Sequence, residues 1–166
     1  LKALESAGHK EMPQFGWLPV TVPGAPAAWA ELSARFGKLP LTEVMAPAIA
    51  YAKQGYPVSP TVGRNWEKAF DTYSRELKDE QFKPWFNTFA AQGRAPKIGE
   101  LWHSPDHART LQSIAETNAR SFYSGIIGDK IDQFSRKYGG LLRKEDLGAY
   151  TPEWVTPINI NYRGYN

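Results

Sequence analysis

The side chains best suited to chemistry in this sequence lie in the stretch His103-Ser104-Pro105-Asp106-His107. Two histidines four residues apart on one helix face can share a metal ion. Proline favours the first turn of a helix, so we expect a helix to begin at Pro105 and to leave His103 outside it. We therefore interpret the polar residues of this stretch as helix-capping groups, and we predict no metal ligand among them.

A second polar group, Lys144-Glu145-Asp146, places two acids beside a lysine. General acid–base catalysis needs side chains that face each other, whereas adjacent residues on a helix point in different directions. Acidic residues are also favoured in the first turn of a helix, near its positive end. The sequence therefore indicates a solvated helix start here, and not a catalytic pair.

Phosphate-binding loops are rich in glycine, and the sequence has two glycine pairs that could belong to such loops, Gly139-Gly140 and Gly125-x-x-Gly128. Neither has the form G-x-G-x-x-G or G-x-x-x-x-G-K-[ST], so we interpret both as helix ends. The chain has no G-x-S-x-G motif and no cysteine, which excludes a nucleophile elbow, a thiol nucleophile, a disulfide and a zinc–thiolate site. From the residues alone we predict no catalytic, cofactor-binding or metal-binding residue.

The composition is that of a globular polypeptide with a mild positive charge. The 166 residues are 42% hydrophobic, which is enough for one domain with a core. The net charge is +3, and the 20 lysines and arginines are scattered along the chain, so we predict no nucleic-acid partner. No apolar run approaches the roughly 20 residues of a membrane helix, so we predict no membrane span in this segment.

The spacing of proline, glycine and apolar residues predicts a mainly α chain. We expect helices over 26–36, 43–54, 60–77, 105–117 and 126–138, and a short helix or packed irregular segment over 82–89. Short turns are expected over 121–124 and 144–149. Thr42 should cap the second of these helices, and Pro47 should kink that helix or mark its start. Short β segments are expected near both ends, at 20–22 and as an edge strand over 155–160 that contains Pro157. Residues 90–103 should form a loop with a small β-ribbon.

Aromatic residues follow the predicted helix faces. Trp29, Leu32 and Phe36 recur at helical spacing and define an apolar face of the first helix. We interpret the tryptophans at 29, 66, 85 and 102 as packing residues, in preference to a stacking platform for a ligand or for bases.

An ordered series of motifs is more specific than any single residue. The series is V-x-V-P-G-A-x-x-x-W at 20–29, R-F-G-x-L-P-L at 35–41, A-P-A-I at 46–49, A-x-x-G-Y-P-V-S at 52–59, A-x-T-L-x-x-I-A at 108–115, F-Y-x-G at 122–125, G-G-L-L at 139–142, E-D-L-x-A-Y at 145–150 and Y-R-G-Y at 162–165. In this order and spacing, residues 16–166 closely resemble the γ-glutamyltranspeptidase family.

The resemblance implies a fold and a chemistry for the intact protein. Members of this family are N-terminal-nucleophile hydrolases with an αββα fold, made as one precursor that cleaves itself into a large and a small subunit. The new N-terminal Thr of the small subunit attacks a γ-glutamyl carbonyl, with its own α-amine as base, and no cofactor takes part. A γ-glutamyl-enzyme then passes its acyl group to water or to an amino acid.

The resemblance also places the chain within such a protein. It corresponds to the middle of the large subunit, as a single fragment over 1–166 that forms the helical outer portion of the fold. Its parts would be a loop and helix end over 1–19, a helical region over 20–150, and an edge strand and turn over 151–166. The partners would be the remainder of the precursor, meaning the large-subunit core and the small subunit.

The resemblance transfers no catalytic residue to this chain. The nucleophilic Thr and the oxyanion-hole glycines of the family lie downstream of residue 166, and the substrate-binding Arg lies upstream. That Arg belongs to an Arg-x-x-x-Ala-Pro motif, which Ala46-Pro47 does not match because Thr42 stands where the Arg would be. We expect the chain alone to be inactive. In the intact enzyme the substrate would be a γ-glutamyl small molecule, and glutathione, acyl-cephalosporin and poly-γ-glutamate enzymes share this scaffold.

Two further expectations accompany the resemblance. The family is mostly secreted, periplasmic or membrane-anchored, so a secreted or periplasmic location is expected for the intact protein. Trp29, Trp154 and Phe15 should be exposed where the rest of the protein would pack, which predicts a tendency to associate. A different class of function, a stand-alone helical protein-interaction domain derived from this scaffold, is the alternative.

Local departures from the family pattern leave the subfamily open. Arg143 stands where Thr or Ser often caps the last short helix, Asn118 stands where Gly is common, and Pro26 stands where Val or Thr is usual. All three affect helix capping only. Asn118 in particular can adopt the left-handed conformation that ends a helix.

Overall fold

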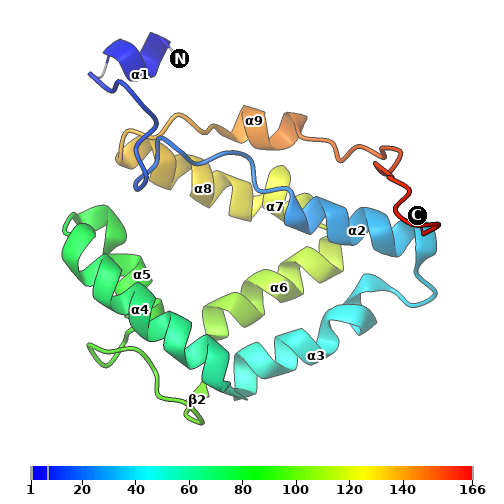
Figure 1. Ribbon diagram of the computed structural model, residues 1–166, viewed down its shortest axis with the longest axis horizontal. Helices are drawn as coiled ribbons and strands as arrows, with labels where there is room; N and C mark the ends of the chain where they lie inside the picture. The colour runs from blue at the N-terminus through cyan, green and yellow to red at the C-terminus, as the bar shows by residue number, and fades with distance from the viewer. Residues whose placement is uncertain (1, 7, 166) are drawn as a thin grey trace.

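The computed structural model describes residues 2–6 and 8–165, and helices dominate it (Figure 1). In chain order the elements are α1 (Lys2–Ser6), α2 (Ala25–Phe36), α3 (Leu41–Gln54), β1 (Tyr56–Pro57), α4 (Pro60–Glu76), a 3-10 turn (Glu80–Phe82), α5 (Lys83–Phe89), β2 (Leu101–Trp102), α6 (Pro105–Thr117), α7 (Arg120–Tyr123), α8 (Ile126–Lys137) and α9 (Lys144–Ala149). The mainly α class predicted from the sequence is confirmed. The expected helix end over residues 1–7 is seen at Lys2–Ser6, while Leu1 and Ala7 lie outside the described residues.

The main hydrophobic core lies between the paired helices α3 and α6 and the short helices α7 and α9 (Figure 1). Its buried members are Leu41, Met45, Ile114, Ala115, Ala119, Tyr123, Leu142 and Leu147. Leu41 and Met45 are four residues apart, so they lie on the same face of α3 and meet α6 together. This core unites residues 41–45 with residues 114–147 and fixes the central part of the chain.

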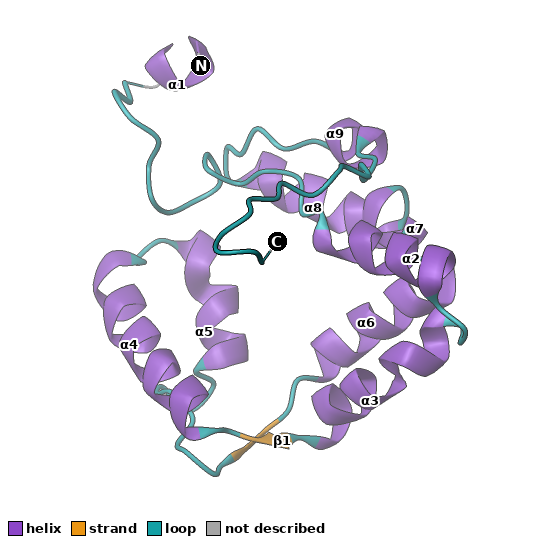
Figure 2. Ribbon diagram, turned by 45° about the vertical axis from the view of Figure 1, so that its right-hand side comes forward, coloured by secondary structure: helices purple, strands orange, loops and turns teal. Residues whose placement is uncertain are grey.

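A second, aromatic cluster holds α4 against α5. Trp66 packs on Phe89 and Trp102 with ring centroids 5.8 and 5.1 Å apart, and Tyr73 packs on Trp85 at 4.8 Å. The Trp66 indole N–H donates to the Phe89 carbonyl at 2.8 Å. Figure 2 shows α4 and α5 on the opposite side of the molecule from α3 and α6, with the β1–β2 pair between the two sides. The packing role predicted for Trp66, Trp85 and Trp102 is confirmed.

Local capping signals predicted several helix ends correctly. The Ser104 hydroxyl accepts a hydrogen bond from the His107 backbone N–H at 3.5 Å at the start of α6. Asn118, with φ of +47°, ends the same helix in the left-handed conformation. Pro105 stands in the first turn, where its missing N–H leaves no hydrogen bond unmade. Each of these signals lies within a few residues of the helix end that it sets.

The β segments predicted near both chain ends are not strands within the described residues. Residues 20–22 form no strand, because Val22 packs against the helical core and no strand lies beside it. The two strands, β1 and β2, lie in the middle of the chain and pair antiparallel, with Tyr56 opposite Trp102. Residues 155–160 have no strand partner among the described residues, and the β structure near that end is one bridge between Tyr162 and Tyr165. One strand of the small ribbon expected within 90–103 is present as β2, but its partner, β1, lies outside that range.

The start of α3 also differs from the expectation. Thr42 does not cap this helix, because the Pro40 carbonyl accepts the first hydrogen bonds, from Glu43 N at 3.0 Å and Val44 N at 3.2 Å. The helix therefore begins at Leu41, and Thr42 lies in its first turn. Pro47 stands inside the helix, so it does not mark the start.

The apolar face of α2 points outward, in agreement with the exposure expected for Trp29. Trp29, Leu32 and Phe36 are exposed, Phe36 to 65%. The face that meets the core carries the small side chains of Ala27 and Ala30, which allow α2 to approach its neighbours closely. Trp29 and Trp154 are exposed as expected, whereas Phe15 is half-buried against Tyr73 at 6.0 Å between ring centroids.

The start of α2 is capped by a residue almost 100 positions away. The Tyr123 hydroxyl accepts a hydrogen bond from Ala27 N at 3.1 Å and donates one to the Pro23 carbonyl at 2.6 Å. Gly24 occupies the N-cap position and offers no side chain. The first N–H groups of a helix have no partner within the helix, so the buried phenol supplies a cap that the local sequence lacks.

An aspartate in the middle of α8 contacts the start of α9. Asp132 accepts hydrogen bonds from Arg136 Nε at 2.8 Å and from Lys144 N at 3.2 Å. The Arg136 guanidinium holds the pKa of the Asp132 carboxyl below its ordinary value of 3.8, and the Lys144 N–H acts in the same direction. The ionised carboxylate is therefore the form that stabilises this junction.

Replacing Tyr123 with Phe should lower the free energy of unfolding by about 1–3 kcal/mol, because Ala27 N and Pro23 O lose their partner. Urea denaturation followed by circular dichroism measures the change. Tyr56→Phe is the matched control, since the described contacts give its hydroxyl no hydrogen bond, and it should change the free energy by less than about 0.5 kcal/mol. Equal effects of the two substitutions would contradict the capping role of Tyr123.

Replacing Leu147 with Ala should lower the free energy of unfolding by about 3 kcal/mol. Leu147 is 0% exposed in the main core, so its truncation leaves a cavity in addition to the lost burial. The control is Leu141→Ala, because Leu141 is 49% exposed and should lose little. Urea denaturation compares the free energies of unfolding of the two variants. A small decrease for Leu147→Ala would show that the core is elsewhere.

The stabilising effect of Asp132 should depend on pH. A carboxylate whose pKa is lowered by folding stabilises the native state above its unfolded pKa, and this stabilisation is lost as the pH falls through the acidic range. The melting temperature of the native protein should therefore exceed that of Asp132→Asn at pH 7, and the gap should narrow towards pH 3. A gap that stays constant from pH 7 to pH 3 would exclude this contribution of the carboxylate.

Candidate functional site

The side chains of the stretch over 103–107 take part in helix capping and aromatic packing. His107 Nδ1 lies 2.7 Å from the Ser104 hydroxyl, and its ring packs against Phe89 and Trp102 at 5.6 and 6.0 Å. Asp106 forms an ion pair with Arg109 on the surface of α6. Across residues 2–6 and 8–165, no three His, Asp or Glu side chains converge as a metal-binding group. The geometry agrees with the capping interpretation.

The acids near Lys144 form helix-terminal contacts. Asp146 accepts a hydrogen bond from Arg143 N at 2.8 Å, and Lys144 forms an ion pair with Asp129 of α8. The Arg143 guanidinium donates to the Gly140 and Leu142 carbonyls at 2.7 and 2.9 Å. These contacts fix α9 on α8, and they bring no acid and base into position around a shared substrate space.

The glycine pairs serve close packing. A Cβ at Gly128 would lie 2.9 Å from the Tyr123 carbonyl oxygen, and one at Gly140 would lie 2.4 Å from Ser135 Oγ and 2.9 Å from Trp17 Cβ. Gly139 has a φ of +73°, a conformation that ends α8 and that residues with side chains rarely adopt. Gly125 and Gly139 stand at the two ends of α8, as predicted, whereas Gly128 lies inside that helix.

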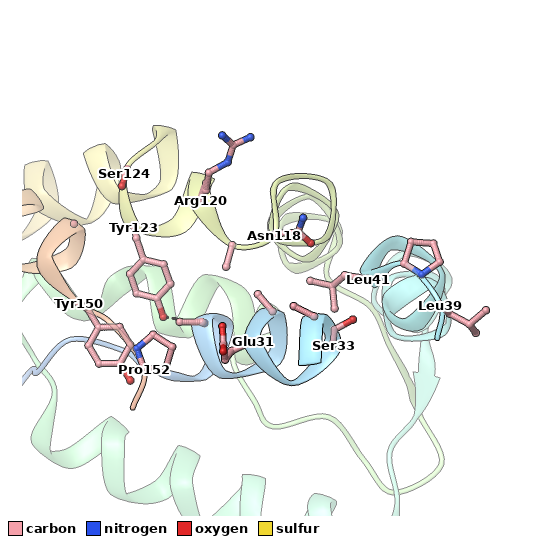
Figure 3. Close-up of a pocket in the computed structure, with 16 residues that line it drawn as sticks. Glu31, Ser33, Leu39, Leu41, Asn118, Arg120, Tyr123, Ser124, Tyr150 and Pro152 are labelled. Carbon is pink, nitrogen blue, oxygen red and sulfur yellow. Dashed lines mark hydrogen bonds between the residues drawn. The ribbon is translucent and has the colours of Figure 1, made fainter. Parts of the chain in front are cut away.

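A groove of about 580 Å³ runs between α2, the α6–α7 junction and the loop after α9 (Figure 3). Ala27, Ala30 and Ala34 of α2 line one wall, and Tyr123 and Tyr150 line another. The two tyrosine rings stack at 5.7 Å between centroids, with 17° between their planes. In Figure 3 the Tyr123 hydroxyl points towards the start of α2, while the Arg120 side chain points away from the groove.

The polar groups of the groove are not arranged for catalysis. Burial raises the pKa of the Tyr123 phenol above its ordinary value of 10.0, so Tyr123 stays protonated near neutral pH and acts as a hydrogen-bonding group. The Ser33 and Ser124 hydroxyls have no His, Lys or Asp hydrogen-bonded to them among the described contacts. Nucleophilic catalysis needs such a base within hydrogen-bond distance. The groove therefore offers space and apolar surface, and no activated group.

The exposed surface is larger than a compact fold would leave. The chain exposes 11978 Å², whereas a compact monomer of this mass is expected to expose about 8,200 Å². Large apolar side chains contribute to the difference along α2 and the segment after α9, among them Trp29, Leu32, Phe36, Trp154, Val155, Ile158 and Ile160. An apolar surface of this kind is typical of a polypeptide that packs against another part of a protein. No helix among the described residues has the length and apolar character needed to cross a membrane.

Sequence reasoning missed the contact between Tyr123 and the start of α2. Pro23-Gly24 was readable as a turn and Phe122-Tyr123 as part of a motif, but no local signal links positions 100 residues apart. The absence of a capping side chain before α2, where Gly24 stands, is the feature that could have pointed to a distant partner.

Comparison with known proteins gives a consistent result over the whole chain. The sequence model of the family described as Gamma-glutamyltranspeptidase matches residues 1–166. The fold is similar to that of cephalosporin acylase from Bacillus halodurans, with a TM-score of 0.95 and 54% identity, covering 98% of this chain and 31% of that one. Helicobacter pylori gamma-glutamyltranspeptidase gives a TM-score of 0.82 and 30% identity, covering 95% of this chain and 44% of that one.

A curated relative agrees with the solved structures. The glutathione hydrolase proenzyme of Escherichia coli strain K12 is 34% identical over 145 residues, which cover 86% of this chain and 24% of the proenzyme. The chain thus spans about a quarter of the length of this relative. The family match over residues 1–166, together with these similarities, shows that the chain belongs to the γ-glutamyltranspeptidase family.

Proposed function

We propose that this chain is the helical outer part of the large subunit of an enzyme that transfers or hydrolyses γ-glutamyl groups. The observation that carries the proposal is the family match over residues 1–166. Proteins similar to this chain are named as enzymes, among them a glutathione hydrolase proenzyme and a cephalosporin acylase. In this proposal residues 1–166 act as one unit, with the helical region over 20–150.

The reaction itself would take place on residues outside this chain. A Thr at the head of the small subunit would attack the γ-glutamyl carbonyl carbon, and its α-amine would accept the hydroxyl proton. The leaving amine would depart with a proton, and water or an amino acid would then take the acyl group. The absence of an activated nucleophile from the described groove is consistent with this division, and no residue of the chain is assigned a catalytic role.

The role of this chain would be structural support for that site. The surplus exposed surface and the outward apolar face of α2, with Trp29 and Phe36, fit a helical layer that packs on the rest of the polypeptide. The precursor of which this chain is a part is thus its principal proposed partner. A stand-alone interaction domain would leave the same surface to an unrelated partner.

The names of the similar proteins point to two substrate classes. The chain is 54% identical to a cephalosporin acylase and 30% identical to a gamma-glutamyltranspeptidase. Both substrates present an acyl group bound through an amide to a small amine, so the same nucleophile chemistry serves both. We propose the γ-glutamyl amide as substrate, because the family model that matches residues 1–166 is that of Gamma-glutamyltranspeptidase, with an acyl-cephalosporin as the competing substrate.

The test is to purify the full-length protein that contains these residues and to assay it with a chromogenic γ-glutamyl anilide. Release of the anilide is expected from the full-length protein, whereas residues 1–166 alone should release none. An acyl-cephalosporin, assayed in parallel, decides between the two substrate classes.

Two outcomes would contradict the proposal. Turnover of the γ-glutamyl anilide by residues 1–166 alone would place the nucleophile inside this chain. A full-length protein that cleaves neither substrate would favour the interaction domain. The position of the nucleophile is read by mass spectrometry, since the acyl-enzyme should form on an N-terminal Thr of a second subunit.

A further inference from the structure

The end of the described chain contains a tight hydrogen-bonded turn. Tyr162 N donates to the Tyr165 carbonyl at 2.8 Å, and Tyr165 N donates to the Tyr162 carbonyl at 3.1 Å. Between them, Arg163 has a φ of +52° and Gly164 a φ of +84°. Positive φ at both central residues is the mark of a type I′ turn, whose twist matches that of two adjoining antiparallel strands. The turn therefore has the geometry of a β-hairpin.

The residues before this turn have the pattern of a strand. Ile158, Ile160 and Tyr162 alternate with polar residues, so an extended chain places all three on one face. Ile158 is 102% exposed and Ile160 is 81% exposed. Exposed β-branched residues in a row at this spacing are typical of a strand whose partner and covering layer lie elsewhere.

We propose that residues 156–162 form the first strand of a β-hairpin and that the second strand is the polypeptide following Asn166 in the full-length protein. The proposal rests on the proposed function, which requires the chain to continue. The partner of residues 156–162 is thus one defined segment, which is joined to them covalently through the turn at Arg163 and Gly164. The second residue after Tyr165 would lie opposite Ile160, and the fourth would lie opposite Ile158.

The turn also sets the register of this hairpin. In an antiparallel pair, hydrogen-bonded and non-hydrogen-bonded residue pairs alternate. Because Tyr162 and Tyr165 form a hydrogen-bonded pair, the N–H groups of Ile160 and Ile158 point towards the new strand. The backbone positions of Asn159 and Pro157 then face the other side.

Pro157 supports this register independently. Proline has no N–H, so within sheets it is found at edges, where the missing donor would face away from the neighbouring strand. In the proposed register Pro157 faces away from the hairpin partner. A slip by one residue would turn Pro157 towards the partner, break the ladder and move Ile158 and Ile160 out of hydrogen-bonded positions.

The start of the strand is fixed on α2. Trp154 Nε1 donates to Glu31 Oε1 at 2.8 Å, and the Arg35 guanidinium lies 4.0 Å from the centroid of the Trp154 ring. Phe36 packs edge-on against the same ring at 5.5 Å. These contacts fix Trp154, two residues before the proposed strand, on α2. The apolar face of the strand would then lie beside the exposed apolar side of that helix.

The test is amide hydrogen exchange at single-residue resolution on the full-length protein. The amides of Ile158 and Ile160 should exchange at least about tenfold more slowly than that of Asn159, since the new strand protects only the first two. Equal, fast exchange at all three positions would overturn the hairpin. Protection at Asn159 without protection at Ile160 would overturn the register.

Proline substitutions provide a matched set of variants. Ile160→Pro removes a donor to the new strand and should abolish the protection of Ile158, whereas Ile160→Ala keeps the N–H and should retain it. Asn159→Pro removes an outward donor, in the same orientation as Pro157, and should also retain the protection of Ile158. Loss of protection in Asn159→Pro but not in Ile160→Pro would reverse the proposed sides of the strand.

The exchange measurement is independent of catalysis. A full-length protein that releases the γ-glutamyl anilide but leaves Ile158 and Ile160 unprotected would overturn the hairpin and leave the proposed function standing. Protected amides in a protein without activity would overturn the proposed function and leave the hairpin standing.

Discussion

The arrangement of this chain depends on one buried hydroxyl group. The Tyr123 phenol bonds both the Pro23 carbonyl and Ala27 N, and a buried hydroxyl without partners would cost free energy. The contact therefore holds the start of α2 against α7. Tyr150 also contributes to this contact, because its ring stacks on Tyr123. It explains the glycine at position 24 as well, since a Cβ there would lie 2.4 Å from the Tyr150 hydroxyl.

This constraint decides which face of α2 is left outside. Ala27 must lie close to Tyr123, so the small residues of the helix turn inward and Trp29 and Phe36 turn outward. Helical spacing alone cannot distinguish an inward apolar face from an outward one, because both follow the same period. In the proposed function this outward face would contact the rest of the precursor, in agreement with the surplus exposed surface.

The sequence predicts what short-range physics determines and misses what long-range contacts determine. Ser104 and Asn118 mark the ends of α6 through interactions within four residues, and both were predictable. The start of α3 was not, because the Pro40 carbonyl replaces Thr42 as the first acceptor. The pairing of Tyr56 with Trp102 joins short segments 46 residues apart, without a hairpin turn between them. For the site, the sequence correctly placed His107 and the glycines in structural roles, but the groove beside Tyr123 arises only from tertiary packing.

A contact also connects the outward face of α2 with the exposed segment over 156–162. Trp154 is held on α2 by Glu31 and Arg35, and the alternating segment begins directly after it. A strand paired with that segment would bring its own side chains towards Ile158 and Ile160, beside the outward face of α2. The outward face of α2 and the proposed strand would therefore form one packing surface, with the Trp154 contact joining its two parts. In the enzyme proposed above, whose nucleophile must be placed exactly, such a surface would contribute by fixing position.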